Sequence, residues 1–558
     1  MRKFKKIMAA AAAAVMTLAM TVSAFADTTI SRQSGDEHIY KVYQIFKGEP
    51  VEAGSNELKN LKYGKNGSDV TRTAVENDTV STDVLNTLRT VNNAEKTDVE
   101  KMEVIKNYLA RTTESFATIN SSTPNLVLPV GYYLIEDVTE KTELETKVDN
   151  SRNYKVVLVS NGSANLEVTI KRNVPTVSKF IQENSTSQFE KTADFSRNET
   201  ITFRILGTLP EDVDFQRYTN YKYQFTDKLE HMNVNPESIK VYLFAGKKTE
   251  TDPNADDLKV ASATATLLDN SGALDAAKMS VNTTNTANFT VEFKDLRTLT
   301  YGSDNKKITG NDLIVLEYTA TFDNETVVAG TANPNEVDLT YSSNPNLDGD
   351  GNQSPDTEKT PKSYAAAFTY KLDATKVDST NSSTTLRGAK FKIRNSNNKY
   401  ATIVNGKVTG WDDEGNEIIT EDNGQILVDG LDQGTYTLVE TAAPANYKLP
   451  TSPANEFSFK ITATADLKTS STTEYELKTL TIAKVGENPL LEVNKRANVA
   501  KDTAPATEGT VYANIKNVPT SSLPTTGGIG TKLFYIVGGA MMFAAAALLV
   551  VKKLRRNA

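Results

Sequence analysis

Short segments in which apolar and polar residues alternate recur along most of this chain, and they constrain its fold more than any other feature. They are rich in threonine, valine, tyrosine and asparagine, and turn residues bound them. Examples are Tyr154–Ser160, Glu199–Ile205 and Thr435–Glu440. A period of two residues is typical of half-buried strands, and short, regularly spaced strands favour antiparallel sandwiches. The sequence therefore predicts a mainly β protein of tandem Ig-like antiparallel β-sandwiches.

One stretch departs from this alternation. Between Ser81 and Ala117, apolar residues recur at the spacing of a helix. They are Val84, Leu85, Leu88, Val91, Val99, Met102, Ile105 and Leu109. This pattern predicts one or two helices inserted in the first domain.

The composition excludes several classes of function. The chain has 558 residues, enough for several domains, and no cysteine, which excludes a disulfide scaffold, Cys-ligated zinc, iron–sulfur clusters and a thiol nucleophile. Its only histidines are His38 and His231, too few for a multi-histidine metal site. The net charge of −8 argues against a nucleic-acid partner. We therefore expect a structural or binding protein without metal or cofactor, not an enzyme.

The first 26 residues have the pattern of a secretory signal peptide. A basic start precedes an apolar stretch, and Ala24 and Ala26 supply small residues before a cut at Asp27. The alternative, a cytosolic amphipathic helix, is disfavoured because the stretch has no polar face.

The C-terminus carries a pentapeptide, an apolar run from Leu533 to Val551 and a basic tail, in that order. The run is just long enough to span the roughly 30 Å of hydrocarbon in a bilayer, and the basic tail favours a cytoplasmic end. The pentapeptide is Leu523, Pro524, Thr525, Thr526 and Gly527. Together these features resemble the LPxTG cell-wall sorting signal of Gram-positive surface proteins; the alternative is a tail-anchored membrane protein.

That resemblance implies a transpeptidase, sortase, that cleaves between Thr526 and Gly527. Thr526 then passes as an acyl group to an amine, and the apolar helix only holds the chain at the membrane beforehand. The mature protein would be secreted and covalently attached to the Gram-positive cell wall.

Turn-rich junctions suggest the domain boundaries. We expect a signal peptide at 1–26, an N-terminal domain at 27–173, and sandwiches at 174–361 and 362–518. The linker, sorting signal, terminal helix and tail follow at 519–558. The loop Asn346–Asn352 is rich in Asp and Asn, but it lacks the spacing of an EF-hand, which favours a polar turn over a calcium site.

The third domain contains the sharpest internal motifs: Leu372–Asp378, Leu386–Ile393, Gly434–Tyr447 and Val511–Asn517. They resemble the collagen-adhesin B-type sandwich of bacterial pilins. In that family a lysine amine condenses with an asparagine carboxamide, promoted by a carboxyl group. The resemblance implies Lys376 as nucleophile, Asn517 as acyl donor and Glu440 as promoting acid, with Asn514 as the alternative donor.

Burial explains why such a reaction proceeds. An apolar interior disfavours both the ammonium and the carboxylate, so it lowers the pKa of a lysine and raises that of a neighbouring carboxyl group. The pair can then exist as a free amine and an acid that hydrogen-bonds the amide. Fixed placement makes the reaction intramolecular.

The second domain resembles the family's A-type sandwich through Val174–Lys179, Tyr221–Leu229 and Leu339–Pro345. This resemblance implies a second set made of Lys179, Asp227 and Asn344.

The first domain resembles an N-terminal pilin domain through Tyr40–Phe46 and Gly131–Asp137. This resemblance implies a third set made of Lys41, Glu136 and Asn173.

The domain types and sorting signal together resemble the Gram-positive backbone pilins, which form covalent pili. In that family a lysine between the first two domains attacks the sortase-bound threonine of the next subunit. Arg172 stands where that lysine is expected, and a guanidinium cannot serve as the amine, so Lys171 is the substitute.

The partners implied are a class C-type pilus sortase, a housekeeping sortase, other copies of the chain, minor pilins and peptidoglycan. The alternative is a singly anchored adhesin that binds a host surface ligand.

Overall fold

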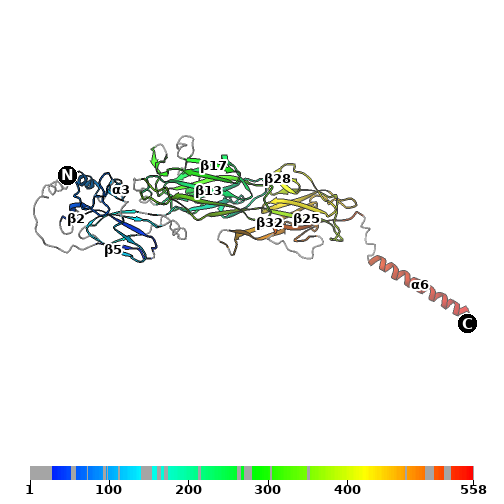
Figure 1. Cartoon of the computed structure of the whole chain (residues 1–558). Helices are drawn as coiled ribbons and strands as arrows, with labels where there is room; N and C mark the ends of the chain where they lie inside the picture. Colours follow the sequence, from blue (N-terminus) through cyan, green and yellow to red (C-terminus); the bar gives the residue numbers. More distant parts are fainter. Residues whose placement is uncertain are drawn as a thin grey trace. The chain divides into compact units, whose positions relative to one another are not determined.

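The computed structural model bears out the mainly β fold with a terminal helix (Figure 1). It describes residues 28–556, except for 35, 52–57, 72, 92–95, 97, 111–113, 140–151, 153, 160–164, 169–173, 211–214, 216, 260–264, 269–278, 302–303, 348–351, 470, 472–473, 497–507 and 521–528. The signal peptide and the LPTTG pentapeptide lie outside the described residues.

Two compact units make up the chain. The first comprises Met1–Lys191, Thr200–Thr321 and Asn333–Ala366, and it contains the predicted first domain with most of the second. The other comprises Thr192–Glu199, Phe322–Ala332 and Ala367–Ala558.

The first domain is a sheet with helices on one face and a smaller sheet on the other. The larger sheet has the order β3-β2-β6-β7 with β4 beside β2, and the smaller has the order β5-β1-β8. The elements are β1 (Thr28–Arg32), β2 (Tyr40–Pro50), β3 (Leu58–Tyr63), α2 (Thr82–Val91), α3 (Asp98–Ile105), η1 (Lys106–Tyr108), β4 (Ala117–Ile119), β5 (Asn125–Leu128), β6 (Gly131–Asp137), β7 (Tyr154–Val159) and β8 (Leu166–Val168).

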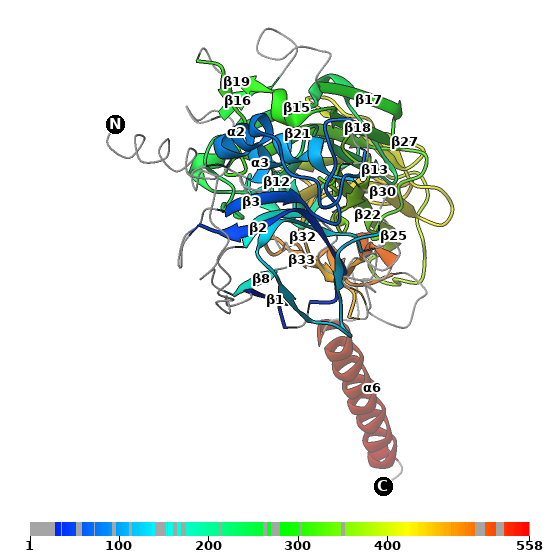
Figure 2. The ribbon, with the colours of Figure 1, turned by 60° about the vertical axis from the view of Figure 1, so that its left-hand side comes forward.

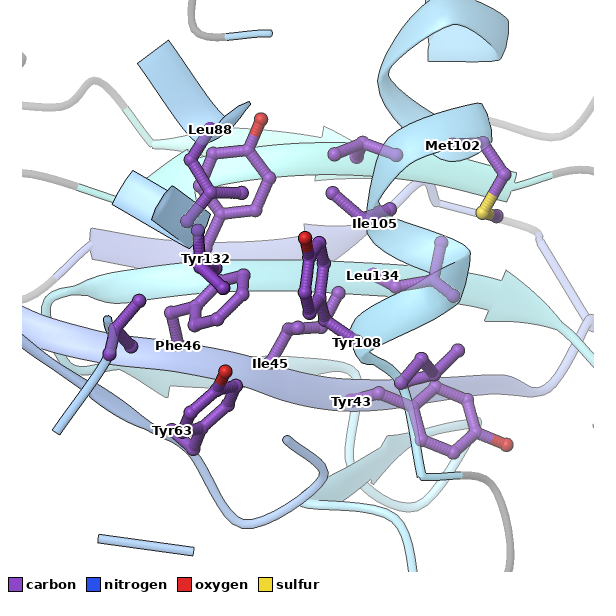
Figure 3. Packing of buried hydrophobic residues seen from close by; sticks show 14 of the residues in the cluster. Tyr43, Ile45, Phe46, Tyr63, Leu88, Met102, Ile105, Tyr108, Tyr132 and Leu134 are labelled. Carbon is purple, nitrogen blue, oxygen red and sulfur yellow. The ribbon is translucent and has the colours of Figure 1, made fainter. Parts of the chain in front are cut away.

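The helices α2 and α3 form where the helical spacing predicted them. The Ser81 hydroxyl accepts a hydrogen bond from Val84 N at the start of α2, as an N-cap does. The helices α2 and α3 lie over the larger sheet (Figure 2). Their residues Leu88, Met102 and Ile105 pack in the core between helices and sheet (Figure 3). The opposite face of that sheet buries residues such as Val42 and Tyr133 against the smaller sheet. Helical insertion therefore gives the central strands a core on both sides.

The second domain is a sandwich of two sheets. One has the order β10-β9-β12-β21-β15-β16 with β14 beside β21, and the other contains the order β24-β22-β13-β18-β17 with β23 beside β22. The strands are β9 (Val177–Gln182), β10 (Phe189–Glu190), β11 (Thr192–Asp194), β12 (Ile201–Thr208), β13 (Tyr223–Leu229), β14 (Met232–Val234), β15 (Lys240–Phe244), β16 (Ala265–Leu267), β17 (Met279–Asn285), β18 (Asn288–Phe293), β19 (Thr300–Tyr301), β20 (Lys306–Lys307), β21 (Leu313–Phe322), β22 (Asn333–Ser342), β23 (Thr357–Lys359) and β24 (Ser363–Phe368). Short 3-10 helices are η2 (Pro236–Ser238), η3 (Asp256–Leu258) and η4 (Leu296–Thr298).

The start of the Asp/Asn-rich loop connects the first two domains. Leu347 is buried in the helix-covered core of the first domain, and Asn346 Nδ2 donates to Asp137 O at 2.8 Å. Arg152 of the first domain pairs with Asp356 at 2.9 Å. The described part of this loop therefore acts as an interdomain contact.

The third domain is one continuous sheet with the order β33-β32-β31-β26-β27-β28-β30-β25-β35-β34, and β29 pairs with β26. The strands are β25 (Tyr370–Asp378), β26 (Lys390–Asn395), β27 (Tyr400–Val404), β28 (Lys407–Asp412), β29 (Ile418–Ile419), β30 (Gln425–Leu431), β31 (Gly434–Ala442), β32 (Glu456–Leu467), β33 (Tyr475–Lys484), β34 (Leu491–Val493) and β35 (Thr510–Asn517). First strand β25 and last strand β35 lie side by side and parallel.

Two segments from within the predicted second domain pack with this unit. The buried Arg197 donates to Val327 O at 3.0 Å and to Asp429 Oδ2 at 3.1 Å. A buried guanidinium needs such acceptors, so this contact fixes both segments against β30.

The terminal helix α6 (Ile529–Arg556) contains Tyr535–Lys553, a 19-residue stretch that is long and apolar enough to cross a membrane.

Candidate functional site

The third domain brings the predicted Lys376, Glu440 and Asn517 together in its interior. They belong to β25, β31 and β35, and all three side chains are 0% exposed. Lys376 Nζ lies 2.5 Å from Asn517 Oδ1 and 3.2 Å from Glu440 Oε2. Asn517 Nδ2 donates to Glu440 Oε1 at 2.8 Å. The one carboxyl group thus contacts both the amine and the amide nitrogen.

The surroundings of this trio are apolar. The rings of Phe391 and Phe457 have centroids 5.3 and 5.6 Å from Lys376 Nζ. Burial lowers the pKa of Lys376 to about 8, although Glu440 opposes the shift. Burial also raises the pKa of Glu440, against the effect of Lys376. Both shifts favour a neutral amine and a protonated acid, the forms that a condensation of lysine with asparagine would require.

Strand register decides between the two donors considered from the sequence. In the parallel pair, Lys376 lies opposite Ile515, and Thr375 lies opposite Asn514. Since successive side chains point to opposite faces, Asn517 shares the face of Lys376, whereas Asn514 lies on the other face. The structure therefore brings Asn517, not Asn514, to the lysine.

The second domain brings Lys179 and Asp227 together, but not with the predicted Asn344. Lys179 Nζ of β9 contacts Asp227 Oδ2 of β13, and both side chains are fully buried. Lys179 Nζ also donates to the Tyr318 hydroxyl at 2.7 Å. Asn335 Nδ2 lies 2.5 Å from that same hydroxyl, and Asn335 is 0% exposed.

The structure places Asn344 outside this cluster, because β22 ends at Ser342, and this corrects the choice made from the sequence. Beyond that strand, Asn344 Nδ2 donates to Asp356 at 3.0 Å, beside the interdomain contact. Asn335 instead belongs to an inward row of β22 that continues through Val337 and Leu339, all 0% exposed. An asparagine in such an apolar row is the signal that sequence reasoning missed.

Burial shifts the ionisation of this second cluster in the same sense as in the third domain. It lowers the pKa of Lys179 to about 8, and the charge of Asp227 opposes this. It raises the pKa of Asp227, while Lys179 works in the other direction. Asn335 Oδ1 is buried and has no hydrogen-bond partner among the described residues.

The first domain differs at its lysine. Lys41 lies directly opposite Glu136 in the β2–β6 pair, and Glu136 is buried. Lys41 itself is exposed, so its amine remains hydrated. Asn173 lies outside the described residues, as do Lys171, Leu523, Pro524, Thr525, Thr526 and Gly527.

The comparisons with known protein families match two parts of the chain, the third domain and the C-terminal segment. Residues 370–476 match the prealbumin-like fold domain SpaA, and residues 515–557 match the LPXTG cell wall anchor motif. The chain is therefore a Gram-positive surface protein, secreted and covalently attached to the cell wall.

One relative narrows the kind of surface protein. The trypsin-resistant surface T6 protein of Streptococcus pyogenes is 26% identical over 280 residues, which cover 43% of this chain and 48% of the relative. The chain thus matches about half the length of that relative. Together with the two family matches, this relative supports the sortase-assembled backbone pilins as the family of this chain.

The matches among solved structures include two pilins. The T6 backbone pilin of S. pyogenes serotype M6 is 16% identical with a TM-score of 0.47, over 90% of this chain and 100% of the other. The major pilin SpaD of Corynebacterium diphtheriae is 15% identical with a TM-score of 0.42, over 90% and 99%.

Proposed function

We propose that this chain is the backbone subunit of a covalently polymerised pilus, and that Lys–Asn isopeptide bonds lock its second and third domains. The observation that carries the proposal is the fully buried contact of Lys376 with Glu440 and Asn517. A charged lysine side chain is strongly disfavoured in a site so far from water. The same logic applies to Lys179 with Asp227 and Asn335.

The proposed reaction in the third domain needs no outside reagent. The neutral Lys376 amine bonds to the carboxamide carbon of Asn517, and one of its protons passes through Glu440 to Nδ2. The bond from that carbon to Nδ2 then breaks, and ammonia leaves. Glu440 regains its proton, so each site reacts once and the protein modifies only itself.

The bond would join the first and last strands of the domain, at positions 141 residues apart. Because β25 and β35 are neighbours, tension that arrives at the C-terminal end passes directly between them. A domain closed in this way would not unfold from its last strand under tension, which suits a load-bearing fibre.

Polymerisation would proceed through sortase. Thr526 of one subunit forms an acyl–enzyme, and Lys171 of the next subunit is the proposed amine; a class C-type sortase suits this step. A housekeeping sortase would attach the finished fibre to peptidoglycan. Minor pilins and a host surface ligand are further proposed partners.

The test of polymerisation is a denaturing gel of cell-wall extracts. A ladder of high-mass species that contain this chain supports the pilus. A single wall-linked species would reject it in favour of the singly anchored adhesin. Lys171→Arg should abolish the ladder while wall attachment persists, and Arg172→Lys is the matched control that should keep it.

The test of the internal bonds is the intact mass of the secreted protein. It should fall short of the sequence mass by one ammonia for each bond, and proteolysis should release the peptide pairs that contain Lys376 with Asn517 and Lys179 with Asn335. A mass equal to that of the sequence would overturn both bonds.

A further inference from the structure

The two buried clusters differ in how the acid reaches the amide. In the third domain Glu440 contacts both Lys376 and Asn517. In the second domain Asp227 contacts Lys179, but among the described residues no hydrogen bond joins it to Asn335. Aspartate is one methylene shorter than glutamate, so the acid reaches less far. The Tyr318 hydroxyl fills the difference.

This hydroxyl has three partners, which are the three groups of the proposed reaction. It donates to Asp227 Oδ1 at 3.0 Å and accepts from Lys179 Nζ at 2.7 Å. It also accepts from Asn335 Nδ2, the leaving nitrogen, at 2.5 Å. A hydroxyl has one proton to donate and two lone pairs, so its capacity is filled.

We propose that Tyr318 is a catalytic residue of the second domain, which shuttles a proton from the attacking Lys179 amine to the leaving nitrogen of Asn335. The inference rests on the proposed isopeptide bond. In the third domain, Glu440 alone contacts both the amine and the amide nitrogen. In the second domain, the phenol of Tyr318 makes the contact with the amide nitrogen.

The step balances without another reagent. Lys179 Nζ bonds to the carboxamide carbon of Asn335, and a proton passes from Nζ to the Tyr318 oxygen. The phenol's own proton turns from Asp227 to Nδ2, the bond from carbon to Nδ2 breaks, and ammonia leaves. Tyr318 and Asp227 end with as many protons as they began. Burial raises the pKa of Tyr318 well above its usual value, so the phenol enters the reaction with its proton in place.

The ring of Tyr318 already has a packing role, which a phenylalanine would keep. It stacks on Phe203 at 5.4 Å and meets Phe289 edge-on at 4.8 Å. The rings near Lys376 are Phe391 and Phe457, which lack a hydroxyl. The hydroxyl, not the ring, therefore distinguishes the second cluster.

The test is the rate of bond formation in Tyr318→Phe. The full chain is recovered unfolded from insoluble aggregates and refolded, and mass spectrometry follows the peptide pair that joins Lys179 to Asn335. We expect formation about 100-fold slower than in the parent, the loss typical of one general acid–base group. The pair that joins Lys376 to Asn517 should form at the parent's rate.

Tyr223→Phe is the matched control. It removes another buried hydroxyl of the same sandwich, which donates to Thr208 O at 2.9 Å, away from the cluster. Its bond should form at the parent's rate. Equal rates in Tyr318→Phe and the parent would overturn the shuttle, and so would an equal slowing in both variants.

Two further results separate the possible failures. If the parent never forms the Lys179–Asn335 pair, the proposed function fails for this domain, whatever Tyr318 does. If Tyr318→Phe does not fold, site-specific replacement of Tyr318 by a fluorinated tyrosine changes the acidity of the phenol with little change in shape. An altered rate then supports the shuttle, and an unaltered rate overturns it.

Discussion

The first and third domains each place a lysine close to a glutamate, yet only one of the two pairs is buried. Lys41 lies opposite Glu136 on a neighbouring strand and is exposed. Lys376 meets Glu440 across the interior of its domain, where both are 0% exposed. Adjacency in a strand register therefore does not by itself bury a lysine. In the proposed reaction, removal of the amine from water is what makes the lysine a nucleophile.

The largest effect expected from this comparison is that of Lys376→Ala. It should remove one ammonia loss from the intact mass and lower the free energy of unfolding of the third domain by roughly 5 kcal/mol, the value of closing a loop of this size. Denaturant unfolding and intact mass measure the two effects. Lys41→Ala is the control: it should leave the mass unchanged and the stability within about 0.5 kcal/mol. A mass change in Lys41→Ala would show that the exposed Lys41 forms a bond as well.

The second domain tests whether a buried position identifies the donor. Asn335→Ala should abolish the peptide pair with Lys179, because the acyl donor is gone. Asn344→Ala should leave that pair intact, since its side chain bonds Asp356 instead. Peptide mapping distinguishes the two. Loss of the pair in Asn344→Ala alone would restore the donor expected from the sequence.

Replacing Glu440 by the shorter aspartate gives the third domain the same acid as the second. Glu440→Asp should slow the Lys376–Asn517 bond by about 100-fold, as expected for a catalytic group displaced by about 1 Å. In the described part of this domain, the rings beside Lys376 Nζ are those of Phe391 and Phe457, which have no hydroxyl to take its place. Refolding followed by peptide mapping gives the rate. An unchanged rate would show that the dual contact of Glu440 is not needed.

A smaller effect is expected from pH. At neutral pH we expect Lys376 and Glu440 to hold one exchangeable proton between them. As long as that proton stays on the pair, the ratio of the ion pair to the neutral pair does not depend on pH. Burial lowers the pKa of Lys376 to about 8, and above this pH the pair loses its proton and Glu440 remains a carboxylate. The rate of bond formation during refolding should then fall about tenfold per pH unit, since a single proton is lost. A rate that rises with pH above 8 would contradict the need for a protonated acid.

Sequence patterns predicted the parts of the fold and site that depend on local periodicity or on a motif. The strands, the helices between Ser81 and Ala117, and the trio around Lys376 are of this kind. The sequence did not identify Asn335 or Tyr318 as site residues. Each is a single inward-facing residue of its strand, and the groups that it contacts lie on other strands. The sequence favoured Asn344 over Asn335 because it did not show that β22 ends at Ser342, before Asn344.

The parallel pairing of β25 with β35 decides which part of the third domain carries load. Once Asn517 is joined to Lys376, a pull from the wall-attached end enters β25 through that link and bypasses everything in between. The force then does not pass through the hairpin of β32 and β33 or through the connecting turns of the domain. In the proposed fibre, changes in the length or sequence of these segments would therefore leave the loaded path intact.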